Sequence, residues 1–233
     1  MNKKSYKNLL LKFLKAGYSF KNFNNFQKNK TSQVILRHDV DFDINFALEM
    51  SLIEERLGIK STYYFLLTSD SYNIFSPRNK AIIKEISRMS HEVSLHFDPT
   101  VYKNEAEGFK FEKNLFESRF CKIKSISFHR PSKNILQGVR WLPKDIINTY
   151  DNNFFKKIFY VSDSGGSFKY GHPTKSDTFM NKKNMQLLTH PIWWMCDKKD
   201  TISKIKEFIS LNKKKMSEHI SKNCKPWKEF IND

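Results

Sequence analysis

Val34-Ile-Leu-Arg-His-Asp39 begins with three apolar residues, two of them β-branched, and ends on a residue able to bind metal or move a proton. Its length and composition are typical of a buried strand. Four further runs end in the same way: Glu92-Val-Ser-Leu-His96, Ser125-Ile-Ser-Phe-His129, Ile158-Phe-Tyr-Val-Ser-Asp163 and Met185-Gln-Leu-Leu-Thr-His190. The carboxyl ends of parallel strands converge on one face of an α/β fold. We therefore expect these side chains, although distant in the sequence, to meet in one pocket.

Segments with helical periodicity alternate with these runs. A sixth strand is predicted at Ser61-Thr-Tyr-Tyr-Phe-Leu-Leu67, which is β-branched and aromatic. Apolar residues at helical spacing predict helices over residues 5–16, 45–57, 79–89, 105–119 and 201–212. Apolar strands separated by helices predict a parallel α/β sheet that is covered on both faces, either open or closed into a barrel.

The length of 233 residues and the hydrophobic content of 39% suit one domain with a sizeable core. We expect a helix and connector over residues 1–33, the sheet and its helices over 34–200, and a C-terminal helix with a basic tail packed on the barrel over 201–233. No stretch approaches the roughly 18 consecutive apolar residues of a transmembrane segment. Any membrane contact is therefore expected to be peripheral.

The beginning of the chain and its cysteines bear on localisation. The apolar segment Leu9-Leu-Leu-Lys-Phe-Leu14 is short and interrupted by a lysine, which does not fit a signal peptide. Cys121, Cys196 and Cys224 are odd in number and widely spaced, which predicts reduced thiols rather than a disulfide framework or a cysteine zinc site. We therefore expect a cytoplasmic protein.

The formal net charge of +17 favours an anionic partner such as phosphate, nucleic acid, acidic glycan or a lipid surface. The lysines are dispersed, however, and no nucleic-acid-binding motif is present. Lysine-rich solvated faces are the simpler interpretation, and we expect no nucleic-acid partner.

Arg37-His38-Asp39-Val40-Asp41 carries the strongest local signal for chemistry. Side chains alternate across a strand, so Asp39 and Asp41 point the same way and His38 points the other way. Two neighbouring carboxylates repel each other unless a cation or a shared proton lies between them. The alternative is a turn that caps the next helix, a role for which Asp43 is the better candidate.

Three histidines, His96, His129 and His190, each end a predicted strand. A single histidine in that position is often structural, but three of them together with the aspartate pair favour a metal site. A catalytic zinc needs about three nitrogen or oxygen ligands and one open position, which two histidines and one aspartate would provide.

Four motifs resemble, in their order and approximate spacing, those of the polysaccharide deacetylase family (carbohydrate esterase family 4). They are Ile35-Leu-Arg-His-Asp-Val-Asp41, Ser90-His-Glu-Val-Ser-Leu-His96, Phe128-His-Arg-Pro131 and Leu187-Leu-Thr-His-Pro191. The resemblance covers residues 34–192 and is strongest to divergent members associated with O-antigen or capsule gene clusters. It implies a distorted (β/α) barrel of six to seven mostly parallel strands in a single domain. Six strands can be placed from the sequence, and the seventh is unassigned.

The resemblance also implies roles for the metal-site residues. Asp39 resembles the catalytic base, Asp41 a metal ligand, and His96 the first histidine of the family's His-x-x-x-His motif. The match breaks at position 100, which is threonine. We therefore expect His129 to be the third ligand of a divalent metal, with Asp98 as the second choice and zinc as the metal that these ligand types favour.

The remaining roles are carried over in the same way. Arg130 matches an arginine that orients the catalytic aspartate, and His190 matches the general acid. Asp163 falls where the family often contacts substrate, although an aspartate-initiated turn is an alternative. Trp193 and Trp194 are expected to form an aromatic wall for a sugar ring, with burial in the core as the alternative.

The resemblance thus implies a metal-dependent hydrolase that removes an N-acetyl or related acyl group from a sugar of a surface-polysaccharide precursor. The acylated substrate would be nucleotide-linked or lipid-linked, because it must be available in the cytoplasm. Two alternatives stay open: a catalytically degenerate glycan-binding protein, and a metal amidohydrolase or deformylase acting on another C–N bond.

Overall fold

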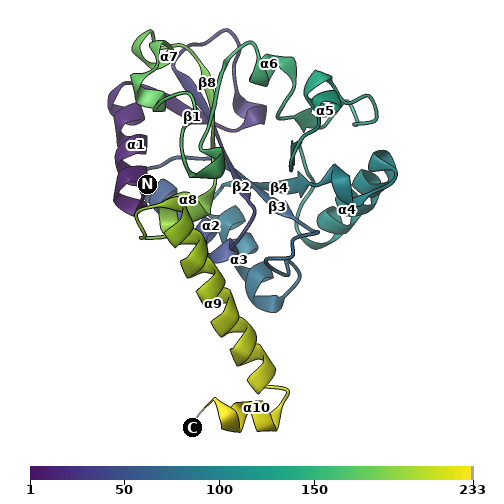
Figure 1. Cartoon of the computed structure of the whole chain (residues 1–233). Helices are drawn as coiled ribbons and strands as arrows, with labels where there is room; N and C mark the ends of the chain where they lie inside the picture. The colour runs from purple at the N-terminus through teal and green to yellow at the C-terminus, as the bar shows by residue number, and fades with distance from the viewer. Residues whose placement is uncertain (232–233) are drawn as a thin grey trace.

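A parallel sheet forms the centre of the computed structural model, which describes residues 1–231 (Figure 1). Its strands are β1 (Ser19–Lys21), β2 (Gln33–Val40), β3 (Thr62–Leu66), β4 (Glu92–Phe97), β5 (Ser125–Phe128), β6 (Ile147–Asn148), β7 (Phe159–Ser162) and β8 (Met185–Thr189). Seven of them follow the order β6-β5-β4-β3-β2-β8-β7, and β1 pairs with the beginning of β2. Every strand pair is parallel. The curled sheet is an open barrel, since β6 and β7 lie at opposite ends of this order.

This architecture confirms the expected distorted (β/α) barrel. All six predicted strands are present, and the strand that could not be assigned is β6, between β5 and β7 in the sequence. Two residues are too few to give a periodic pattern, which explains why β6 could not be recognised. The three-residue β1 escaped prediction for the same reason.

The helices are arranged around the sheet (Figure 1). They are α1 (Lys3–Lys15), α2 (Ile44–Arg56), α3 (Pro77–Arg88), α4 (Glu105–Arg119), α5 (Lys133–Gln137), α6 (Asn152–Phe155), α7 (Asp177–Met180), α8 (Pro191–Met195), α9 (Thr201–Ser221) and α10 (Lys225–Phe230). Short 3-10 turns lie at Phe23–Asn25, Pro99–Val101, Ser164–Gly166 and Pro173–Lys175. Over residues 1–231, none of the helices is both long enough and apolar enough to cross a membrane.

Helix α2 begins where the sequence predicts, because Asp43 caps it: its Oδ1 accepts a hydrogen bond of 2.9 Å from the backbone N–H of Asn45. Helix α9 is longer than predicted and continues to Ser221. Its first turns pack on the barrel through the buried residues Lys204 and Phe208. The rest of α9 extends away from the sheet and carries α10 at its far end (Figure 1).

Strand β2 is buried along its whole length and divides two polar clusters. Arg37 and Asp39 face the inside of the barrel, where Arg37 contacts Tyr150 and Gln186. His38 faces outward, as alternation predicts, and its Nε2 lies 2.8 Å from a carboxylate oxygen of Glu54 in α2. Because side chains alternate along β2, one face of the strand carries Arg37 and Asp39 inside the barrel. The other face carries His38, which attaches α2 to the sheet.

Glu54 is the centre of the outer cluster. Its carboxylate accepts hydrogen bonds from the hydroxyls of Ser61 at 2.6 Å, Tyr63 at 2.9 Å and Tyr6. Burial alone would raise the pKa of Glu54. The neighbouring His38 and the hydrogen bonds that the Glu54 carboxylate accepts lower that pKa to about 2. The buried, charged carboxylate thus connects α2 to α1 and to the sheet through its hydrogen bonds.

Glu112 in α4 is a buried carboxyl group with the opposite tendency. Its Oε1 accepts a hydrogen bond of 2.7 Å from the hydroxyl of Tyr102, while Oε2 is without a hydrogen-bond partner among the described residues. Burial, the largest cause, raises the pKa of Glu112 from its ordinary value of 4.5 to about 7, and nearby Asp98 adds to the increase. The folded protein therefore holds this proton more tightly than the unfolded chain does.

The Glu112→Gln variant should consequently change how stability depends on pH. The stability that the wild type gains from protonated Glu112 is complete below about pH 4.5 and is lost as the pH rises through about 7. At about pH 8 we expect the variant to be more stable than the wild type by roughly 2–3 kcal/mol, with little difference at about pH 4.5. Urea unfolding at the two pH values measures this, and an unchanged difference between them would contradict it.

Candidate metal and catalytic centre

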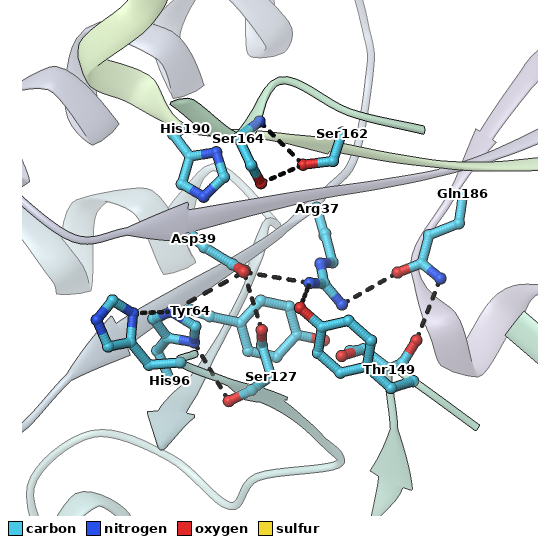
Figure 2. Close-up of polar contacts among 12 residues, drawn as sticks. Arg37, Asp39, Tyr64, His96, Ser127, Thr149, Ser162, Ser164, Gln186 and His190 are labelled. Carbon is cyan, nitrogen blue, oxygen red and sulfur yellow. Dashed lines mark hydrogen bonds and ion pairs between the residues drawn. The ribbon is translucent and has the colours of Figure 1, made fainter. Parts of the chain in front are cut away.

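The carboxyl ends of four strands bring the predicted residues together. Asp39 and Asp41 come from the end of β2, His96 from β4, His129 from just after β5 and His190 from just after β8. Figure 2 shows Asp39 between His96 and Arg37, with His190 approaching from the opposite side. The side chains at these strand ends do meet, since the interatomic distances of the contacts described below are all 4.0 Å or less.

Asp41, His96 and His129 form a cluster of three possible metal ligands. His96 Nε2 lies 3.3 Å from Asp41 Oδ1 and 3.2 Å from His129 Nδ1, and His129 Nδ1 lies 3.6 Å from Asp41 Oδ1. Three ligands held at about 2.0–2.1 Å from one tetrahedral zinc ion lie roughly 3.3–3.4 Å from each other. The three atoms therefore have the spacing of one face of a tetrahedral coordination shell.

A hydrogen bond directs the electron pair of His96 into this face, and His129 points one ring nitrogen at it. His96 Nδ1 donates to the carbonyl oxygen of Ser127 at 3.2 Å, which leaves Nε2 free to bind a metal. His129 presents Nδ1 to the cluster and Nε2 to Asp98, whose Oδ2 is 4.0 Å away. Asp41 Oδ1 is buried and accepts no hydrogen bond among the described residues. A divalent cation satisfies all three atoms at once, so the donor set fits a metal.

The ionisation of these groups is consistent with that fit. Burial alone would raise the pKa of Asp41, but His96, His190 and His129 lower it to about 2, so the carboxylate is charged. Burial alone would lower the pKa of His96, but Asp39 and Asp41 raise it above the ordinary value. A proton and a metal ion therefore compete for His96, and metal binding should weaken as the pH falls.

Asp98, the second choice for a ligand, is occupied by other partners. Its Oδ1 accepts hydrogen bonds from the backbone N–H of Thr100 at 2.9 Å and from the Thr100 hydroxyl at 2.6 Å, and its Oδ2 accepts one from Arg130 at 3.1 Å. Asp98 thus caps the turn over Pro99–Val101, and the threonine at the position where the family pattern has histidine donates to that cap. This leaves His129 as the third member of the cluster and gives Asp98 the role of facing its outer nitrogen.

Asp39 lies beside the cluster with one oxygen fixed and one oxygen free. Its Oδ2 accepts hydrogen bonds from Arg37 Nη2 at 3.2 Å and from the Ser127 hydroxyl at 3.0 Å (Figure 2). Its Oδ1 is buried and has no hydrogen-bond partner among residues 1–231. Such an oriented carboxylate with a free acceptor oxygen can take a proton from a molecule that enters the site.

The predicted orienting role of Arg130 is wrong. Its side chain is 70% exposed and pairs with Asp98, whereas Arg37 contacts Asp39. Arg37 is held in turn by Gln186 Oε1 at 3.1 Å and the hydroxyl of Tyr150 at 2.9 Å. The spacing of two residues between Arg37 and Asp39 on one strand was the signal that could have identified this pair.

His190 is the second candidate for proton transfer. Its Nδ1 lies 2.6 Å from Asp163 Oδ1, and its Nε2 lies 3.7 Å from Asp41 Oδ2. Burial alone would lower the pKa of His190, but the hydrogen bond and charge of Asp163 raise it to about 9. At neutral pH the imidazole is therefore protonated, with Nδ1–H bound to Asp163 and Nε2–H directed toward the metal cluster.

The expected substrate contacts of Asp163, Trp193 and Trp194 must be revised, because all three side chains are buried. Asp163 is fully buried and accepts hydrogen bonds from His190 and from Trp194 Nε1, the latter at 2.6 Å. Trp193 packs against Phe42 with ring centroids 6.2 Å apart. Since β7 and β8 are neighbours, the strand order could have indicated that Asp163 meets His190.

A polar cleft opens next to this centre, between the loop after β3, the beginning of α2 and the middle of α9. Its volume is about 730 Å³. Tyr72 connects it to the end of β2 by donating a hydrogen bond of 2.7 Å to the carbonyl oxygen of Val40. Its lining combines amide and hydroxyl side chains with charged ones, the former being Asn45, Ser69, Ser71, Asn73, Ser76, Asn79 and Asn212 and the latter including Asp43, Asp70, Arg78, Lys215, Glu218 and Lys222. This lining suits a ligand rich in hydroxyl groups.

An Asp163→Asn variant should reduce proton donation by His190. Asparagine is uncharged, so the pKa of His190 should fall toward its ordinary value of 6.5 and less imidazole would be protonated at neutral pH. We expect the pKa measured by NMR titration of His190 to fall by at least about one unit. Glu207→Gln, which removes a carboxylate bound to Cys196 rather than to His190, is the control, and an equal pKa change in both variants would contradict the pairing.

Comparison with known proteins adds no assignment: no protein-family model and no curated protein matches the chain.

Proposed function

We propose that the protein is a metal-dependent hydrolase that removes an N-acetyl or related acyl group from a sugar of a surface-polysaccharide precursor. The observation that carries this proposal is the position of two opposite proton-transfer groups beside one three-ligand cluster. Asp39 offers a free carboxylate oxygen, and His190 offers a proton on Nε2. The resemblance of four sequence motifs to the polysaccharide deacetylases supports the same reaction class.

Asp41, His96 and His129 would hold the divalent metal, for which zinc is the best match to the ligand types. When bound, such a metal supplies polarisation of the acyl carbonyl and a lower pKa for the attacking water. Asp39 accepts the proton of that water through its free Oδ1, while Arg37 and Ser127 keep the carboxylate in place. Activation of the carbonyl and the water would thus belong to the metal cluster, and proton removal to Asp39 beside it.

His190 completes the reaction by giving its Nε2 proton to the leaving amine. Asp163 holds Nδ1, so the ring cannot rotate without losing a buried hydrogen bond, and Asp163 keeps the ring protonated at neutral pH. An acid with a pKa of about 9 and a carboxylate base on the other side of the cluster form the pair that amide hydrolysis requires.

The proposed substrate is an acylated sugar linked to a nucleotide or a lipid carrier. The polar cleft beside the centre suits sugar hydroxyls and amides, and the net charge of +17 favours a phosphorylated carrier. The three cysteines are free thiols, in keeping with the reducing cytoplasm, where such precursors would be available.

The test is to remove bound metal, add zinc, cobalt or nickel, and supply N-acetylated nucleotide sugars and lipid-linked glycans. We expect metal-dependent release of acetate with an equal amount of free amine. Formate release, or hydrolysis of a cyclic amide in place of acetate release, would favour the deformylase or amidohydrolase alternative. Glycan binding without metal uptake or hydrolysis would contradict the proposal in favour of a degenerate binding protein.

A further inference from the structure

The C-terminal part of the chain exposes an unusual share of the large hydrophobic side chains. Of the eleven such side chains that are exposed over residues 1–231, seven lie in α9, in α10 or directly after α10. They are Ile202, Ile209, Leu211, Met216, Ile220, Phe230 and Ile231. Single exposed apolar residues are ordinary, but a concentration of them indicates a surface that binds something.

Four of these residues form one stripe along α9. Ile202, Ile209, Met216 and Ile220 follow one another at spacings of seven, seven and four, which places them on one side of a helix. Lys213 lies at the edge of the same side, where its long side chain can reach outward from the apolar residues. The buried side of the helix is a different one and carries Phe208. The apolar stripe is therefore not the side that packs on the barrel.

We define the C-terminal arm as residues 209–231, which comprise the outer part of α9 together with α10. The arm projects from the barrel, and α10 turns back at its tip (Figure 1). Trp227 Nε1 donates a hydrogen bond of 3.1 Å to the hydroxyl of Ser217, the residue after Met216. The rings of Trp227 and Phe230 are 5.4 Å apart. The tip of the arm thus joins aliphatic residues of α9 to an aromatic pair of α10.

The charge of the arm selects among partners for this surface. It carries six lysines, namely Lys213, Lys214, Lys215, Lys222, Lys225 and Lys228, against the two glutamates Glu218 and Glu229. A second copy of the arm would bring like charges together. It would also place Asn212 and His219, the residues three positions after Ile209 and Met216, in the contact between helices, where a coiled coil needs apolar side chains. An anionic partner is therefore favoured over dimerisation.

We propose that the C-terminal arm binds the surface of a membrane that contains anionic phospholipids. Its aliphatic stripe and its aromatic pair would enter the interface, and its lysines other than Lys215 would contact the head groups, as in basic amphipathic helices. Lys215 pairs at 2.7 Å with Asp43, two residues after Asp41, so the arm leaves the barrel beside the candidate catalytic centre. Binding through the arm would hold that centre close to the lipid surface. This inference does not depend on the proposed reaction.

The test is flotation of the full chain with vesicles of phosphatidylcholine alone and of phosphatidylcholine mixed with phosphatidylglycerol. We expect binding to the mixed vesicles that weakens with added salt, and much weaker binding to the neutral vesicles. A triple variant, Met216→Glu, Ile220→Glu and Phe230→Glu, should reduce binding to the mixed vesicles by at least about tenfold. The changed residues are all exposed, so the barrel should stay folded.

The matched control is the triple variant Val101→Glu, Phe111→Glu and Met180→Glu. It changes three exposed hydrophobic residues elsewhere on the chain and alters the net charge by the same amount. We expect it to bind the mixed vesicles as the wild type does. Absence of wild-type binding to the mixed vesicles, or an equal loss in both variants, would overturn the proposal. So would a wild-type dimer in sedimentation equilibrium that only the arm variant loses, combined with no vesicle binding.

Discussion

Replacing Asp39 by Asn should lower the rate of acyl removal by about 10²–10⁴-fold, because the loss of a positioned general base has an effect of this size. Asparagine has nearly the same shape and can still accept a hydrogen bond from Arg37 or Ser127, both of which now bind Oδ2 of Asp39. Asp39 is not a member of the three-ligand cluster, so zinc stoichiometry should be unchanged. The measurements are kcat with the acylated sugar that the protein hydrolyses, and zinc content by elemental analysis.

Two controls separate a chemical effect from a structural one. Arg37 loses a buried ionic partner in the Asp39→Asn variant, so thermal unfolding should be followed together with activity. Arg130→Gln is the second control, because Arg130 pairs with Asp98 and not with Asp39. We expect it to change kcat by less than about tenfold, as befits a partner outside the cluster. Activity of Asp39→Asn within about threefold of the wild type would exclude Asp39 as the base.

The sequence alone was sufficient for the framework of this site. Strands that end at Asp39, His96, His129 and His190 could be recognised because each is a short run of consecutive or alternating apolar residues that ends on a polar one. Parallel strands then place their carboxyl ends together, whatever the lengths of the connections between them. The face on which the site lies and the identity of its main residues therefore followed from local pattern and topology.

The residues that hold those groups were harder to predict, since they depend on which strands are neighbours. Asp163 was predicted to end a strand and to contact substrate, yet β7 lies beside β8 and directs the carboxylate of Asp163 at His190. The motif resemblance indicates Arg130, whereas the alternation of side chains along β2 places Arg37 on the same side as Asp39. Such contacts join residues that are distant in the sequence. They can be predicted from the sequence pattern only when the order of the strands in the sheet is known.

The length of the C-terminal helix could not be predicted from the sequence. The apolar spacing over residues 201–212 predicted a helix of ordinary length that packs on the barrel, and Phe208 does so. The lysine-rich continuation has little apolar content on the packed side, so it offered no reason to extend the helix. In the structure the helix continues to Ser221, with its remaining apolar residues directed away from the core.

The third ligand is the point at which the sequence left a choice, and removal of His129 tests it. His129→Ala takes away one of three converging donor atoms and should weaken zinc binding by more than about 100-fold. Asp98→Ala removes the carboxylate that faces the outer nitrogen of His129 and that caps the turn over Pro99–Val101, for which a loss of about 10–100-fold is expected. His219→Ala, an exposed histidine on α9, is the matched control and should leave zinc affinity unchanged.

Competition with a chelating dye measures all three affinities under one set of conditions. The expected order of loss is His129→Ala, then Asp98→Ala, then His219→Ala. Zinc affinity of the wild type should also fall as the pH is lowered, because the raised pKa of His96 favours its protonated form in competition with the metal. If Asp98→Ala instead lost more affinity than His129→Ala, Asp98 would be the direct ligand and His129 its outer partner. The geometry argues against that outcome, since Thr100 and Arg130 already occupy both carboxylate oxygens of Asp98.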